Sequence, residues 1–359
     1  MESTAPLTVN PIAHNAPSVS ANWKADFVQA AHAFGFARVG FTEATRAPHA
    51  DAFETWIENG CHGEMKWLER TPERRADPRN VLPGVQTVIA LATAYHQPEE
   101  IHPPGRVASY ARNLDYHDIL EPRLRLLETH LAALGGTQRS YVDTGPILER
   151  DFAARAGLGW QGKSTMLISQ NIGAFFFLST ILTTLRIEPD SPAKHRCGSC
   201  TRCIEACPTG AITAPYHLDA RKCIAYLTIE LKGSIPEELR PLIGDRIYGC
   251  DDCAAVCPWN RFAIASTETA FAKRDALKPA HLRDYLSLDE ESFRLAFKGS
   301  PIKRIKRKGF LRNVCVALGN VGTPDDLETL NAATADPDPL IAEHAAWAVS
   351  QIQQRHKNT

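Results

Sequence analysis

Eight of the ten cysteines lie in one stretch of the chain, and their spacing is typical of ligands to iron–sulfur clusters. The first half, from Cys197 to Pro208, reads C-x2-C-x2-C-x3-C-P, the run found in bacterial ferredoxins. The second half has Cys223 alone and then a closing C-x2-C-x3-C-P from Cys250 to Pro258. Thiolates at these intervals hold four-iron four-sulfur clusters, so the sequence predicts electron-transfer chemistry.

In the ferredoxin run the fourth cysteine ligates the other cluster of the pair. The spacing therefore predicts two quartets, each of which takes one cysteine from the far half of the stretch. The first quartet consists of Cys197, Cys200, Cys203 and Cys257. The second quartet consists of Cys207, Cys223, Cys250 and Cys253.

Zinc and disulfide bonds are the alternatives for so many cysteines. Paired C-x2-C motifs also form tetrahedral zinc sites, but the two C-x3-C-P endings and the lack of histidine at ligand spacing favour iron–sulfur clusters. Disulfides are typical of small secreted domains, whereas residues 1–20 show no secretory signal, so we expect a cytoplasmic protein. The two separate cysteines, Cys61 and Cys315, are expected to be ordinary buried thiols.

The chain divides into four parts around this stretch, and the expected fold class is α+β multidomain. Residues 1–20 are polar with three prolines and are expected to be a disordered lead-in. Residues 21–186 are expected to form an α/β domain, and residues 187–265 a ferredoxin-like double-cluster domain. Residues 266–359 are expected to form a helical, HEAT-like domain.

Apolar spacing predicts the elements of the α/β domain. Helices are expected at 23–34, 120–134 and 148–156, and strands at 37–41, 85–92 and 140–142. The strand at 85–92 is largely apolar, as in a buried strand. The apolar stretch 174–185 is too short to cross a bilayer, which takes about 20 residues, and is expected in the core.

The C-terminal part contains a weak internal repeat, because residues 312–319 match residues 343–350 in apolar pattern. Two such segments are typical of a HEAT-type repeat, in which paired helices bury a face that neither could bury alone. Two unrelated amphipathic helices are the alternative.

The formal net charge is −1, so any nucleic-acid partner requires a local basic patch. The best candidate is the basic segment 303–308, with one more arginine a helical turn further on. An ordinary solvated run of charges is the alternative. The residues expected to bind RNA phosphates are Lys303, Arg304, Lys306, Arg307 and Arg312.

Two clusters joined to a large α/β domain suggest that they feed electrons to a bound cofactor. A dinucleotide is not indicated, because the glycine-rich segment 157–163 follows a predicted helix rather than a strand. A non-catalytic ferredoxin-type electron-transfer protein is the alternative, although it would not need a domain of this size.

Several strings resemble epoxyqueuosine reductase, and the resemblance runs from about residue 21 to the C-terminus. The strings are Tyr141–Arg150, Gly159–Lys163, both cysteine halves, Tyr226–Leu231, Arg246–Cys253 and Cys257–Arg261. The resemblance implies a cobalamin cofactor, two four-iron four-sulfur clusters and a tRNA substrate. It also implies the reaction, in which epoxyqueuosine at the anticodon wobble position loses its epoxide oxygen and becomes queuosine. A cobalamin-dependent reductive dehalogenase is the nearest enzyme alternative, but such proteins usually carry an export signal.

The resemblance also implies roles for particular residues. Asp143, on the loop after the predicted strand 140–142, would be the acid that protonates the departing oxygen; the alternative is that it only caps a turn. The base-on cobalamin motif D-x-H-x-x-G starts at Asp115 but fails at Leu120, which agrees with the family's base-off binding. We also expect an external low-potential electron donor, a monomer and no membrane association. The candidate cobalamin contacts are Arg106, Tyr110, Lys163, Ala225 and Asp251, and Lys232 is a further candidate for contact with the tRNA.

Overall fold

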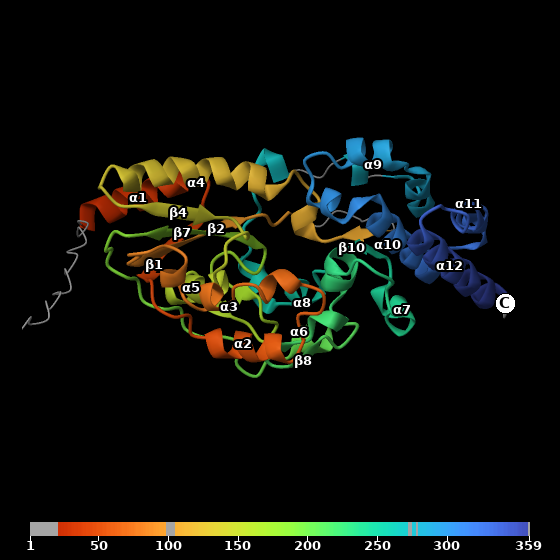
Figure 1. Cartoon of the computed structure of the whole chain (residues 1–359), viewed down its shortest axis with the longest axis horizontal. Helices are drawn as coiled ribbons and strands as arrows, with labels where there is room; N and C mark the ends of the chain where they lie inside the picture. The colour runs from red at the N-terminus through yellow and green to blue at the C-terminus, as the bar shows by residue number, and fades with distance from the viewer. Residues whose placement is uncertain (1–20, 98–104, 272–274, 278, 358–359) are drawn as a thin grey trace, which may run out of the picture.

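The computed structural model describes residues 21–97, 105–271, 275–277 and 279–357 (Figure 1). The expected disordered lead-in, residues 1–20, lies outside the described residues. No helix in the described ranges is both long enough and apolar enough to span a membrane.

A four-stranded sheet forms the centre of the N-terminal part, with strand order β1-β2-β7-β4. All three strand pairings are antiparallel, so the prediction of an α/β domain is wrong, and this part has an α+β architecture. The strand β2 is buried on both faces because helices cover both sides of the sheet, and this removes the alternation that usually marks an antiparallel strand. The strands are β1 (Arg38–Glu43), β2 (Thr87–Ala94), β4 (Gln138–Tyr141) and β7 (Phe176–Thr183).

Helices pack on both faces of this sheet, as Figure 1 shows. On one face Phe27 and Leu124 pack with Ile89 and Ile181 of the sheet. On the other face the alternating residues of β2 turn toward Phe152 and its helix. The predicted helices and strands are confirmed with bounds shifted by a few residues, and the apolar stretch 174–185 contains the central strand β7. The helices are α1 (Ala21–Ala33) and α4 (Tyr116–Ala132) on the first face, and α2 (Ala50–Glu58), α3 (Pro72–Ala76) and α5 (Glu149–Arg155) on the second.

The cysteine segment is built from short elements that the loops connect. Each half has one short helix, α6 (Arg202–Glu205) and α8 (Asp252–Ala255), and the two helices pack against each other. The strand β3 (Arg106–Val107) pairs in parallel with β10 (Arg246–Tyr248), which ties the segment after residue 105 to the second half. The remaining short strands are β5 (Trp160–Gln161), β6 (Leu167–Ile168), β8 (Ile212–Ala214) and β9 (His217–Leu218).

The C-terminal part is helical, and its core also includes Val107, Ile229 and Ile247 from earlier segments of the chain. The two segments of the predicted repeat lie on α10 (Lys306–Val321) and α12 (Pro339–Lys357), which pack along each other. Gly319 allows this close approach, because a Cβ there would lie 2.3 Å from the Trp347 ring. The HEAT-like character of the pair stays a prediction. The other helices here are α9 (Glu290–Ala296) and α11 (Leu327–Ala333), and α7 (Arg240–Ile243) of the cysteine segment packs against α10.

Candidate active site

The eight clustered thiols fall into two groups, and within each group the thiols raise one another's pKa. Burial raises the pKa of Cys257, and the nearby thiols of the first predicted quartet raise it further. Burial likewise raises the pKa of Cys253 well above its usual range, with further contributions from the other members of the second quartet. The structure therefore brings together the same two sets of cysteines that the spacing predicts. In the described ranges no group of three or more His, Cys, Asp or Glu side chains has the arrangement of a site for a single metal ion.

Hydrogen-bond donors point at some of these sulfurs. The indole Nε1–H of Trp160 donates to Cys197 Sγ at 3.4 Å, and the backbone N–H of Ala211 donates to Cys207 Sγ at 3.2 Å. Donors to ligand sulfur stabilise the negative charge of a reduced cluster and so tune its potential. The backbone around both quartets is thus arranged to hold thiolates.

Asp143 lies on the loop that follows β4, as predicted, and its side chain is exposed. Its φ angle is 58°, in the left-handed region that side chains rarely adopt and that is common at functional sites. Its carboxylate Oδ2 accepts a hydrogen bond of 2.9 Å from the hydroxyl of Tyr116, at the start of α4. No other hydrogen bond of this carboxylate occurs within the described residues, so the alternative of a turn cap finds no support.

A second carboxyl group, Glu149 on the first turn of α5, lies beside Asp143. Its Oε1 atom is buried without a partner among the described residues. Burial raises the pKa of Glu149 well above its usual range, and the charge of Asp143 raises it further. The guanidinium of Arg75 is close enough to both carboxyl groups to feel their charge. Glu149 is not among the site residues predicted from the sequence, although it lies in the family-like string that ends at Arg150.

A continuous set of contacts leads from the second quartet to Asp143. Asp251, which follows Cys250, accepts a 2.6 Å hydrogen bond from the backbone N–H of Ser109. The next residue, Tyr110, has its ring centroid 6.2 Å from that of Tyr116, the partner of Asp143. The second quartet and the predicted acid therefore lie at two ends of one site.

The other predicted cobalamin contacts lie at different places. Arg106 donates from Nε to Asp245 at 2.6 Å, close to the second half of the cysteine segment. Burial raises the pKa of Cys223, and the nearby backbone of Ala225 partly offsets this effect. Lys163 is not part of this group, because its ammonium donates to the Gly198 and Cys200 carbonyls, in the loop of the first quartet, at 2.7 and 3.0 Å.

Part of the predicted RNA patch forms one exposed basic surface. Lys303 and Lys306 are exposed, and Arg304 pairs with Glu230 at 2.7 Å while lying over the Trp67 ring. Lys232 belongs to the same surface, because the charge of Arg304 contributes to lowering its pKa after the larger effect of burial. The structure thus brings Lys232 to the segment that starts at Lys303.

Comparisons with known proteins decide the family. The epoxyqueuosine reductase of Escherichia coli K12 is 41% identical over 332 residues, which cover 89% of this chain and 87% of the relative. That of Pseudomonas aeruginosa is 38% identical and covers 98% of this chain and 100% of the relative. The chain belongs to the epoxyqueuosine reductase family. A family model described as epoxyqueuosine reductase QueG, DUF1730 matches residues 75–144, and one described as a 4Fe-4S double cluster binding domain matches residues 196–260.

Solved epoxyqueuosine reductases have the same fold. One, crystallised with an epoxyqueuosine-modified tRNA-Tyr stem loop, superposes with a TM-score of 0.86 at 31% identity, covering 92% of this chain and 90% of that one. Another, from Streptococcus thermophilus, gives a TM-score of 0.84 at 28% identity, with 93% and 91% coverage. A third, from Bacillus subtilis, has the loop of its catalytic aspartate swung out of the active site, and gives a TM-score of 0.85 at 31% identity, with 92% and 90% coverage.

The prediction that Arg312 binds an RNA phosphate is wrong. Its side chain is only 1% exposed, and burial lowers its pKa to about 10. Arg307 is also largely occupied, since it pairs with Asp336 at 2.7 Å. Both residues lie on faces of α10 that pack inward, which a run of basic letters does not reveal. The guanidinium of Arg312 donates to the carbonyls of Leu227, Leu231 and Gly233 at 2.7–2.8 Å.

Replacing Arg312 by Ala is therefore expected to affect stability. The change leaves three carbonyls without a buried donor, and we expect it to lower the free energy of unfolding by about 3 kcal/mol. Lys306→Ala on the exposed side of the same helix is the matched control, expected to change stability by less than about 0.5 kcal/mol. Anaerobic denaturation of the cluster-loaded protein measures both. Equal stability of the two variants would contradict the structural role of Arg312.

Proposed function

We propose that the protein reduces epoxyqueuosine in tRNA to queuosine, with Asp143 as the proton donor and two four-iron four-sulfur clusters as the source of electrons. The observation that carries this proposal is the contact chain that joins Asp251, beside Cys250, to Asp143 through Tyr110 and Tyr116. Removal of the epoxide oxygen as water takes two electrons and two protons and leaves a carbon–carbon double bond. The site offers a route for both. No observation favours a dehalogenase or a non-catalytic electron carrier.

The residues around this site fit cobalamin, the cofactor that the family implies. The amide of Asn113 is buried, and its Nδ2 atom has no partner among the described residues, in the same segment as Ser109 and Tyr110. The corrin ring of cobalamin carries carboxamide groups that accept such hydrogen bonds. We propose that Tyr110, Asn113 and Asp251 hold the cofactor, with Arg106 and Ala225 at its margin. When bound, cobalamin supplies a strongly reducing metal centre next to the second quartet.

The chain's own residues handle the protons. The Tyr116 hydroxyl orients the Asp143 carboxyl group, on a residue whose backbone is left-handed. Burial and the charge of Asp143 raise the pKa of Glu149, which favours its protonated form beside Asp143. We propose that Asp143 protonates the departing oxygen and that Glu149 and solvent restore its proton.

The tRNA would bind over the basic surface that includes Lys303 and Lys306. One solved relative binds an epoxyqueuosine-modified stem loop, and exposed lysines near an active site are suited to phosphates. We expect Lys303→Ala with Lys306→Ala to weaken binding of such a stem loop by about 10-fold and to reduce the slope of affinity against salt by about 1–2. Fluorescence anisotropy across a salt series measures both.

The control for this pair removes two exposed arginines elsewhere, Arg125→Ala with Arg186→Ala, and is expected to leave the salt slope unchanged. An unchanged slope in the lysine pair would remove this surface from the account.

The activity itself is tested by nucleoside analysis. Epoxyqueuosine-modified tRNA is incubated anaerobically with the cluster-loaded protein, cobalamin and a chemical reductant, then digested and analysed by mass spectrometry. We expect queuosine to replace epoxyqueuosine. Persistence of epoxyqueuosine with intact clusters would contradict the proposed function.

A further inference from the structure

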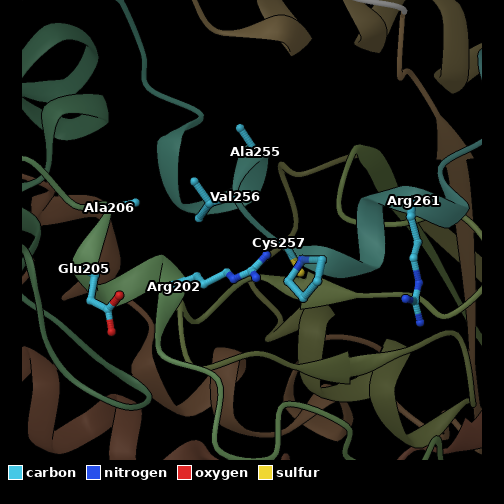
Figure 2. Close-up of a pocket in the computed structure, with 8 residues that line it drawn as sticks. Arg202, Glu205, Ala206, Ala255, Val256, Cys257 and Arg261 are labelled. Carbon is cyan, nitrogen blue, oxygen red and sulfur yellow. The ribbon is translucent and has the colours of Figure 1, made fainter.

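One cavity of the described structure lies in the cysteine segment, away from Asp143. It is an open hollow of about 710 Å³ between the two short helices of the cysteine segment, and Cys257 of the first quartet is part of its lining. In the view of Figure 2, Cys257 lies between the side chains of Arg202 and Arg261. A predicted cluster ligand therefore lies directly under an open, concave surface.

The hollow carries unbalanced positive charge. Arg202 and Arg261 line it, and Arg196 lies 5.9 Å from the centroid of the adjoining Trp259 ring. Within the described ranges none of these three exposed arginines forms an ion pair with a carboxylate. The one acidic residue in the lining, Glu205, accepts a hydrogen bond from Thr201. In a chain of net charge −1, this is a local cationic surface rather than part of a general field.

Large apolar side chains adjoin these charges. Phe262 is 40% exposed and Ile264 is 59% exposed, just after the second C-x3-C-P ending. Inside them Trp259 packs edge-on against Trp160, whose indole donates to Cys197 of the first quartet. Exposed apolar side chains next to arginines are typical of protein–protein interfaces. Small interfaces of this kind are typical of transient redox complexes.

The two quartets lie in different surroundings. The second quartet adjoins the contact chain to Asp143, whereas the first quartet reaches the surface at the hollow. Electrons for the reaction must enter the protein from outside. Cys257, a predicted ligand of the cluster of the first quartet, is accessible at the hollow, so the hollow is a suitable point of entry.

We propose that the hollow over Cys257 docks a small acidic electron-carrier protein, which passes single electrons to the cluster of the first quartet. This rests on the proposed function, which needs a supply of electrons. Each encounter oxidises the carrier by one electron and reduces the cluster by one, so two encounters supply one deoxygenation. Attraction between opposite charges speeds such encounters, and salt weakens that attraction. RNA is also a polyanion, but the exposed apolar side chains and the cluster ligand in the lining favour a redox protein.

The test reverses the charge of the hollow with Arg202→Glu and Arg261→Glu. The probe is a reduced bacterial flavodoxin, an acidic one-electron carrier, and the readout is the rate at which the oxidised clusters bleach in an anaerobic stopped-flow instrument. At low salt we expect the second-order rate constant to fall by about 10–100-fold, and the difference from the unchanged protein to shrink as salt rises. The Kd for oxidised flavodoxin should rise in parallel.

The matched control, Arg125→Glu with Arg186→Glu, makes the same change in net charge on exposed residues outside the hollow. It is expected to reduce the rate constant by less than about 3-fold. If the reversed pair loses its clusters, Arg202→Gln with Arg261→Gln takes its place, with an expected fall of about 3–10-fold. Reduction by photoreduced deazaflavin, a small molecule that needs no docking, should proceed equally in all variants.

Three results would overturn the proposal: an unchanged rate with flavodoxin, an equal loss in the control pair, or a loss of tRNA stem-loop binding that shows the surface to be an RNA site. Failure of the proposed function has a different signature. In that case the flavodoxin dependence on charge persists while no variant converts epoxyqueuosine with any reductant.

Discussion

Asp143→Asn is expected to reduce queuosine formation by about 100-fold to 10,000-fold, the range for loss of a positioned general acid. The amide has the size of the carboxyl group and still accepts the hydrogen bond of Tyr116, but it has no acidic proton to transfer. Because the change lies outside both cysteine quartets, iron content, cluster absorbance and affinity for the tRNA stem loop should stay as in the unchanged protein. Single-turnover nucleoside analysis measures the effect.

Two comparisons sharpen this prediction. Asp26→Asn, an exposed carboxylate on α1, is the matched control and should retain full turnover. Glu149→Gln should cause a smaller loss than Asp143→Asn, since it removes the reserve proton but keeps the donor. Turnover of Asp143→Asn within a factor of about 3 of the unchanged protein would exclude the acid role.

The crossed quartets predict a specific pattern of iron loss in double variants. Cys207 and Cys253 belong to the same quartet, so Cys207→Ala with Cys253→Ala should keep the first cluster and about four irons. Cys203 and Cys207 are close in sequence but belong to different quartets, so Cys203→Ala with Cys207→Ala should lose both clusters. Either pair should reduce turnover by at least about 100-fold, because each removes ligands of the inner cluster.

Iron and sulfide analysis with electron paramagnetic resonance distinguishes the outcomes. Cys61→Ala with Cys315→Ala is the control, because neither thiol belongs to a quartet, and it should keep about eight irons. The reverse pattern, with four irons retained by the Cys203 and Cys207 pair and none by the Cys207 and Cys253 pair, would show that each half of the stretch builds its own cluster.

The site was predictable from the sequence where ligand chemistry imposes a spacing. Eight sulfurs around two clusters allow few arrangements, so the intervals from Cys197 to Cys257 already indicate which thiols meet. The position of Asp143 at a strand end was equally readable, because β4 and its loop are local features. Local apolar spacing likewise located the helices and strands of the sheet.

The features that could not be predicted from the sequence depend on contacts between distant segments. The direction of β2 follows from its neighbours β1 and β7, and continuous burial made it resemble a parallel strand. In the sequence Arg312 is one more positive charge of a basic segment. In the fold its guanidinium donates to the backbone carbonyl of Leu227. Glu149 acquires its raised pKa only because folding buries it beside Asp143.

The most direct test of the account is a single turnover without added reductant. The protein, loaded with both clusters and cobalamin, is reduced, freed of excess reductant and mixed anaerobically with epoxyqueuosine-modified tRNA. We predict queuosine in stoichiometric amount with the chain, together with oxidation of the clusters, and none from protein that lacks cobalamin. Clusters that stay reduced while the epoxide persists, or equal product without cobalamin, would contradict the account.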